Sequence, residues 1–130
     1  MSPVIQPDTS EAEDLTPIEP GTYKARIVSG ASQLSAEKKQ PMFVPTFKIT
    51  VDGKERTRKA YIPVTGAGAF GFDQILRAVG EVELAEKFKA NPGQVPFDTD
   101  MLNNRELNVV IGTQIYNGQP RDLIQSYLPV

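Results

Sequence analysis

Residues 42–64, MFVPTFKITVDGKERTRKAYIPV, contain the pattern that decides the fold. Strand-forming runs flank the pair Asp52-Gly53, and an Asp-Gly pair in this setting is typical of a tight two-residue hairpin turn. Pro45 predicts an edge or a bulge at the start of the first strand, because proline cannot donate to the hydrogen-bond ladder. In the second strand, one face carries Thr57, Lys59 and Tyr61, and the other carries Arg56, Arg58, Ala60 and Ile62.

The segment before this hairpin also has a period of two. In residues 21–30, GTYKARIVSG, the residues Tyr23, Ala25 and Ile27 share one face, and Lys24 and Arg26 share the other. This alternation predicts a half-buried strand with a basic outer face. Residues 31–41, ASQLSAEKKQP, are polar and end at a proline, so we expect a long loop there.

The second half of the chain predicts helices followed by a second hairpin. FDQILRAVG, residues 72–80, has apolar residues at helical spacing and ends at Gly80, and residues 81–91 predict a short second helix. Residues 105–130 then predict two strands joined at Asn117-Gly118. The order β-β-β-α-β-β favours a mainly β fold: a five-stranded antiparallel barrel of the OB type, with one or two helices between strands 3 and 4.

Composition divides the chain into an acidic arm and one domain. Residues 1–20 hold five acids, no base and four prolines, so we expect a flexible, disordered acidic N-terminal arm. Residues 21–130 then form one domain of ordinary size. No apolar run approaches the ~20 residues that span a bilayer, and the N-terminus has no basic segment followed by an apolar one. We therefore expect a soluble intracellular protein without membrane partners.

Charge and residue usage favour binding over catalysis. The chain has no Cys, His or Trp, which excludes disulfides, thiolate or imidazole zinc sites and imidazole-dependent triads. The net charge of −2 hides a basic segment, because residues 21–64 hold nine bases and three acids. Such a segment suits a phosphate backbone, and interleaved aromatics can stack on bases. The alternative is a charged face that serves solubility alone. The candidate nucleic-acid-binding residues are Lys24, Arg26, Lys38, Lys39, Phe43, Lys48, Arg56, Arg58, Lys59, Tyr61 and Tyr116.

Two motifs suggest cofactor or metal sites but lack the required context. Residues 64–71, VTGAGAFG, match the dinucleotide-binding pattern G-x-G-x-x-G, which must open the helix of a parallel βαβ unit. Here a hairpin arm precedes it, so we expect a strand-to-helix connection and no cofactor; contact with a nucleic-acid phosphate is the remaining alternative. Asp98 and Asp100 resemble the start of a calcium loop, but the required Gly and closing Glu are missing, so we expect no metal.

Four segments together resemble a family of small phage-encoded single-stranded DNA-binding proteins, found beside recombination and replication functions. The segments are PGTYKARIVSG, QPMFVPTFKITVDGK, FDQILRAVG and VVIGTQIYNGQPRDLIQSYLP, and they cover most of residues 20–129. The resemblance implies an OB-type barrel that coats single strands without chemistry in the cytoplasm of an infected bacterium. Better known single-strand binders carry their acids at the C-terminus, whereas this chain carries them at the front.

The sequence thus favours largely sequence-independent binding of single-stranded DNA in phage replication or recombination, without enzymatic activity. The acidic arm could be a solubilising tail, compete with DNA, or recruit replication or recombination proteins, and the chain could form a homo-oligomer. The alternative function is a small phage structural or interaction module that uses a barrel edge. A nuclease that uses Asp98 and Asp100 is a third hypothesis.

Overall fold

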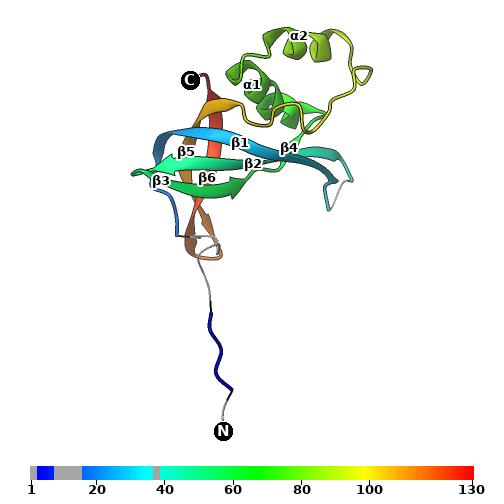
Figure 1. Ribbon diagram of the computed structural model, residues 1–130. Helices are drawn as coiled ribbons and strands as arrows, with labels where there is room; N and C mark the ends of the chain where they lie inside the picture. The colour runs from blue at the N-terminus through cyan, green and yellow to red at the C-terminus, as the bar shows by residue number, and fades with distance from the viewer. Residues whose placement is uncertain (1–2, 8–15, 37–38) are drawn as a thin grey trace.

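The computed structural model of the chain describes residues 3–7, 16–36 and 39–130 (Figure 1). Its strands are β1 (Gly21–Leu34), β2 (Pro41–Val51), β3 (Lys54–Lys59), β4 (Ile62–Pro63), β5 (Glu106–Tyr116) and β6 (Gln119–Leu128). A 3₁₀ turn, η1 (Ala67–Ala69), leads into α1 (Phe70–Ala78), and α2 (Val82–Ala90) follows. Across these residues, neither helix has the length and apolarity needed to cross a membrane.

The protein is mainly β, and its strands form one curled antiparallel sheet. The sheet order is β3-β2-β1-β5-β6, and the short β4 pairs with β2 beyond the end of β3. Every pairing in this sheet is antiparallel. Figure 1 shows the sheet bent into a half-barrel, with both helices gathered at one end of it.

Both predicted hairpin turns are confirmed. Asp52 and Gly53 have φ of 51° and 78°, and Asn117 and Gly118 have φ of 51° and 74°. Positive φ at both central positions is the geometry of a type I′ turn, whose twist matches that of the flanking strands. The turns thus set the registers of β2 with β3 and of β5 with β6.

The predicted loop over residues 31–41 is wrong at both ends. β1 continues to Leu34 and pairs with β2 from Pro41 onward, because the backbone ladder does not require apolar side chains where both faces are exposed. Pro45 lies inside β2, close to a bulge between Ile27 and Ser29 in the β1–β2 register. The carbonyl of Pro45 accepts a hydrogen bond from Ala60 N, just past the end of β3. Because β3 has ended there, the missing N–H of Pro45 interrupts no hydrogen bond of the ladder.

The core lies between the inner face of the sheet and α1. Large buried side chains come from β1, β2 and β5, and α1 adds Phe72, Ile75 and Leu76. The segment before β5 also packs tightly on β1: a Cβ at Gly30 would lie 2.0 Å from the carbonyl oxygen of Thr99. Arg77 links the two helices, because its guanidinium donates to Asp73 of α1 (2.9 Å) and to Glu86 of α2 (2.8 Å).

Residues 16–20 depart from the flexible arm that their composition predicts. Ile18 is buried in the core cluster, and the Tyr23 hydroxyl donates to the carbonyl of Glu19 at 2.6 Å. Prolines and acids obscure this single apolar anchor in the sequence. The part of the predicted arm over residues 1–2 and 8–15 lies outside the described residues.

Candidate nucleic-acid interface

The strand register places four predicted basic residues on the outer face of the sheet. The buried residues of β1 face the core, so Lys24 and Arg26, which alternate with them, point outward. Arg26 lies directly opposite Lys48 of β2. Lys59 lies opposite Thr46, two residues from Lys48 on the same face of β2. The outer face defined by Lys24, Arg26, Lys48 and Lys59 therefore spans β1, β2 and β3.

Two carboxylates contact this outer face without neutralising it. Lys24 Nζ lies 3.4 Å from Glu106 Oε2, and Lys48 Nζ lies 3.6 Å from Glu55 Oε2. All four side chains are about half exposed, and surface ion pairs of this kind contribute only ~0–1 kcal/mol. Beside the half-buried Arg26 they border a shallow hollow of about 240 Å³. A polyanion can therefore compete for these ammonium groups at little cost.

Arg56 and Arg58, predicted to share a groove with these residues, lie on the opposite face of β3. They pair with the core-facing residues Ile49 and Phe47 of β2. Arg58 is only 14% exposed and forms an ion pair with Asp122 of β6, with Nη2 2.9 Å from Oδ2 and Nε 3.0 Å from Oδ1. Its guanidinium is therefore held in a structural contact, which corrects its predicted place in the phosphate groove.

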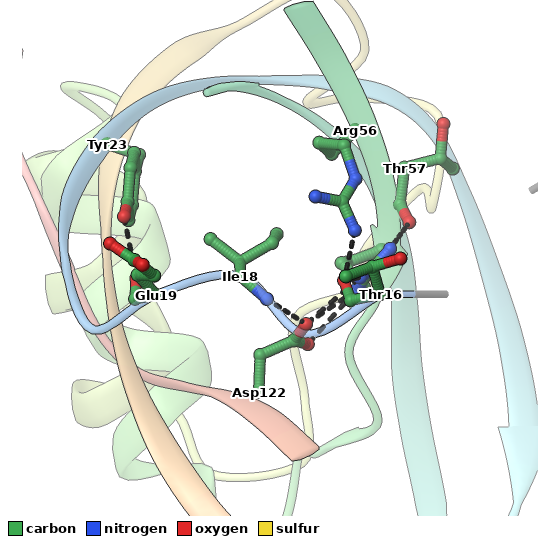
Figure 2. A network of polar contacts seen from close by, with 8 residues as sticks. Thr16, Ile18, Glu19, Tyr23, Arg56, Thr57 and Asp122 are labelled. Carbon is green, nitrogen blue, oxygen red and sulfur yellow. Dashed lines mark hydrogen bonds and ion pairs between the residues drawn. The ribbon is translucent and has the colours of Figure 1, made fainter. Parts of the chain in front are cut away.

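The Arg58–Asp122 pair is completed by the chain that precedes β1 (Figure 2). The carbonyl of Thr16 accepts from Arg58 Nη2 at 3.0 Å and also from Arg56 Nη2. The backbone N–H of Ile18 donates to Asp122 Oδ2 at 2.9 Å. Because β3 and β6 are the two ends of the sheet order, residues 16–18 bridge its two edges. We call residues 16–18 with Arg56, Arg58 and Asp122 the edge clasp.

Asp122 is ionised in this clasp. Its side chain is 12% exposed, and this burial by itself favours the neutral acid. The hydrogen bonds from Arg58 and from Ile18 N, with the charges of Arg58 and Arg56, outweigh burial and hold the pKa of Asp122 below its ordinary value. The clasp is therefore an electrostatic closure of the half-barrel.

The three predicted stacking residues have different surroundings. Phe43 is wrong as a stacking residue, because it is buried in the core with its ring edge-to-face to Phe72 and Phe97. Tyr61 is exposed two residues beyond Lys59, on the same side of the chain by strand alternation. Tyr116 is exposed at the tip of the β5–β6 hairpin.

Arg121 is a candidate residue that the sequence analysis missed. Its guanidinium carbon lies 4.9 Å from the centre of the Tyr116 ring, a cation–π distance. Arg121 pairs with Gln114, so it shares the outer face of the hairpin with Tyr116. A basic residue diagonal to an aromatic one across an Asn-Gly hairpin is the pattern that predicts such a pair.

The remaining predicted residues and motifs lie around the edges of these surfaces. Lys39 is exposed in the β1–β2 connection with a φ of 53°, and Lys38 lies outside the described residues. Gly66, with φ 70° and ψ −165°, opens the turn from β4 through η1 into α1, so the glycine motif serves the expected strand-to-helix connection. Asp98 Oδ1 accepts from Asp100 N at 2.9 Å, as in a turn.

Within the described ranges, no three acidic side chains gather into a metal-binding group. No protein-family model matches this chain, and no curated protein matches it at a significant level.

Proposed function

We propose that this protein binds single-stranded DNA on the outer face of β1, β2 and β3, without sequence readout and without catalysis. The observation that carries the proposal is the alignment of Lys24, Arg26, Lys48 and Lys59 across three paired strands, with Tyr61 at one end. Cationic side chains neutralise phosphates, and an exposed ring offers a stacking surface to any base.

An OB-type barrel is the finer fold that we propose. If the two-residue β4 is set aside, the order β3-β2-β1-β5-β6 corresponds to the path 3-2-1-4-5 of such a barrel, with the helices before its fourth strand. In that fold the second and third strands bind oligonucleotides together with the loops at positions 1–2 and 4–5. Here the first of these connections holds Lys39, and the strands that flank the second carry the Tyr116–Arg121 pair.

The role in phage replication or recombination, in the cytoplasm of an infected bacterium, rests on the family resemblance. The alternative of a module that binds protein through a sheet edge has less support, because residues 16–18 contact both edge strands. The outer face has no comparable covering segment among the described residues.

The direct test is fluorescence anisotropy of a labelled oligo-dT at several salt concentrations. We expect affinity to fall steeply with salt, and Lys48→Ala with Lys59→Ala to lower the slope of log affinity against log salt by about 1.4, at ~0.7 per lost phosphate contact. The matched control is Lys87→Ala with Lys89→Ala, which removes the same charge from α2. Absence of binding at low salt, or equal effects of the two pairs, would overturn the proposal.

A further inference from the structure

The later half of β1 has an unpaired flank, although β1 is a central strand of the sheet. β5 pairs with β1 only over residues 21–26, and the backbone of Ile27 then bonds to the chain just before β5. Beyond that point β1 continues to Leu34 with β2 on one side alone, and residues 31–34 are exposed. This flank is separate from β3 and β6, the two edge strands that the edge clasp bridges.

The hydrogen bonds of β2 show which backbone groups of β1 face this flank. The carbonyls of Pro41 and Pro45 accept hydrogen bonds from the chain on their other side, so both carbonyls point away from β1. Pro41 lies opposite Leu34, and Pro45 lies opposite Gly30. Because an antiparallel ladder alternates bonded with non-bonded pairs, Gly30, Ser32 and Leu34 direct their N–H and C=O groups away from β2. Across the described ranges, none of these outward groups has a hydrogen-bond partner.

The free flank lacks the features that usually protect a strand edge. Natural edges carry charges, prolines or bulges, because unpaired backbone groups otherwise bind a further strand. Residues 28–36, VSGASQLSA, contain no charged residue and no proline. The bulge of β1 lies between Ile27 and Ser29, before the free segment begins. Residues 30–34 can therefore receive another strand along their whole length.

The spacing of the outward groups suits the same strand from a second copy. In an antiparallel pair with a two-fold axis at Ser32, Ser32 meets its counterpart, and Gly30 of each copy meets Leu34 of the other. Every outward residue then lies opposite an outward residue, which gives three bonded pairs and about six backbone hydrogen bonds. A shift by one residue would set outward groups against inward ones, and a shift by two would lose one pair. The self-paired register is therefore the one that uses all the outward groups.

Charge at the two ends of the free segment is also self-complementary. Lys39 is exposed in the turn that follows β1, and the exposed Asp98 and Asp100 flank Thr99. The carbonyl oxygen of Thr99 lies over Gly30, at the other end of the segment, where a Cβ would be 2.0 Å from it. Among the described residues, neither Lys39 nor the two acids form an ion pair. In the two-fold pair, the turn of each copy lies beside Gly30 of the other, so Lys39 approaches both acids. This match favours a second copy over an unrelated strand.

We propose that two copies of this chain pair antiparallel through residues 30–34 of β1 and form a two-fold dimer. Residues opposite each other in a sheet share a face, so the outer faces of both copies point to the same side of one continuous sheet. The dimer requires no nucleic acid, and its failure would leave the proposed DNA binding untouched. Combined with that function, it would present two copies of the outer face to one strand of DNA.

The first test uses the absence of cysteine from the natural chain. Ser32→Cys should give a disulfide-linked dimer on mild oxidation, because a bonded pair at the two-fold axis places the two Cα atoms about 5.5 Å apart. Gln33→Cys should not link to itself, since its counterpart lies on a diagonal about 7–8 Å away. Gln33→Cys mixed with Ala31→Cys should link, because these residues lie opposite each other in the proposed register. Absence of a linked Ser32→Cys dimer, or equal linkage of Gln33→Cys alone, would overturn the pairing.

The second test is sedimentation equilibrium of the natural chain and its charge variants without DNA. We expect a dimer at micromolar concentration, and Lys39→Glu should raise its dissociation constant at least about fivefold, because like charges then meet twice in each dimer. Lys54→Glu, the same charge change at the exposed start of β3, should leave the constant unchanged. Adding Asp100→Lys to Lys39→Glu should recover most of the lost affinity. A monomer at every concentration, equal weakening by the two single variants, or no recovery in the double variant would overturn the proposal.

Discussion

Strand β3 carries two kinds of basic side chain, and a single step along its backbone separates them. Lys59 is exposed on the outer face, where phosphate could reach it. Arg58, the preceding residue, is enclosed by the edge clasp with Asp122 and the carbonyl of Thr16. Positive charge in the sequence therefore has two uses in this fold, and the face of the strand decides which one applies.

The residue types fit the two environments. Lysine is a strongly hydrated point charge, and three of the four residues of the outer face are lysines. The edge clasp uses arginine twice, and Arg58 donates from two nitrogens to both oxygens of one carboxylate. Arginine suits such a planar, half-buried pair because its guanidinium is rigid and weakly hydrated. Variants on the two surfaces should accordingly change different measured quantities.

The largest expected effect is loss of stability on cutting the clasp at its apolar anchor. Ile18 is buried among core residues, and Ile18→Ala should reduce the free energy of unfolding by about 3 kcal/mol, since truncation of a buried isoleucine leaves a cavity. Urea denaturation measures this loss. The control Leu34→Ala, at an exposed residue of β1, should change stability by less than about 0.5 kcal/mol. Similar values for both variants would show that residues 16–20 are not part of the folded domain.

Asp122→Asn should cause a smaller loss of stability, and this loss should depend on pH. The folded-state pKa of Asp122 lies below its unfolded value of about 3.9, so its ionised form stabilises the fold above that pH and this contribution is lost as pH falls through the folded pKa. We expect the variant to lose about 2 kcal/mol at pH 7, because Arg58 keeps a charge with a weaker partner.

Urea denaturation of both proteins between pH 7 and pH 2.5 checks this prediction. The difference in unfolding free energy should shrink as the pH falls below about 4, where the wild-type carboxyl also becomes neutral. DNA affinity at pH 7 should be unchanged, because the clasp lies on the inner side of the sheet. A difference that stays constant with pH would contradict an ionised Asp122.

Local patterns were sufficient to predict the hairpins and the β1 face. The Asp52-Gly53 and Asn117-Gly118 turns require positive φ, which few residue pairs tolerate, so the residue pair alone predicts each turn. Alternation in β1 and β3 likewise assigned each basic residue to a face of its own strand correctly. The error came in combining strands: alternation does not say which face of β3 matches the outer face of β1.

The edge clasp could not be predicted from the sequence for the same reason. Asp122 and Arg58 are 64 residues apart, and nothing in either segment indicates that β3 and β6 approach each other at the two edges of the sheet. The prediction for Phe43 was wrong for a different reason. Its position near the start of a strand is compatible with exposure, but Phe72 of α1 and Phe97 of the segment before β5 supply the rings that bury it. Burial of this kind is a tertiary property.

The smallest expected effect tests the outer face by removing its two acids. Glu55→Gln with Glu106→Gln breaks both surface ion pairs and leaves Lys24 and Lys48 in place. Stability should change by less than about 0.5 kcal/mol per pair, since exposed pairs contribute little. Affinity for oligo-dT at low salt should rise about threefold, because the two lysines no longer share their charge with carboxylates and the face gains two units of positive charge. The matched control Glu83→Gln with Glu86→Gln removes the same charge from α2 and should leave affinity unchanged. If affinity rises equally in the control, net charge alone attracts DNA and the outer face is not its site. If affinity rises only in Glu55→Gln with Glu106→Gln, while Asp122→Asn changes stability alone, the two faces of β3 have separate functions.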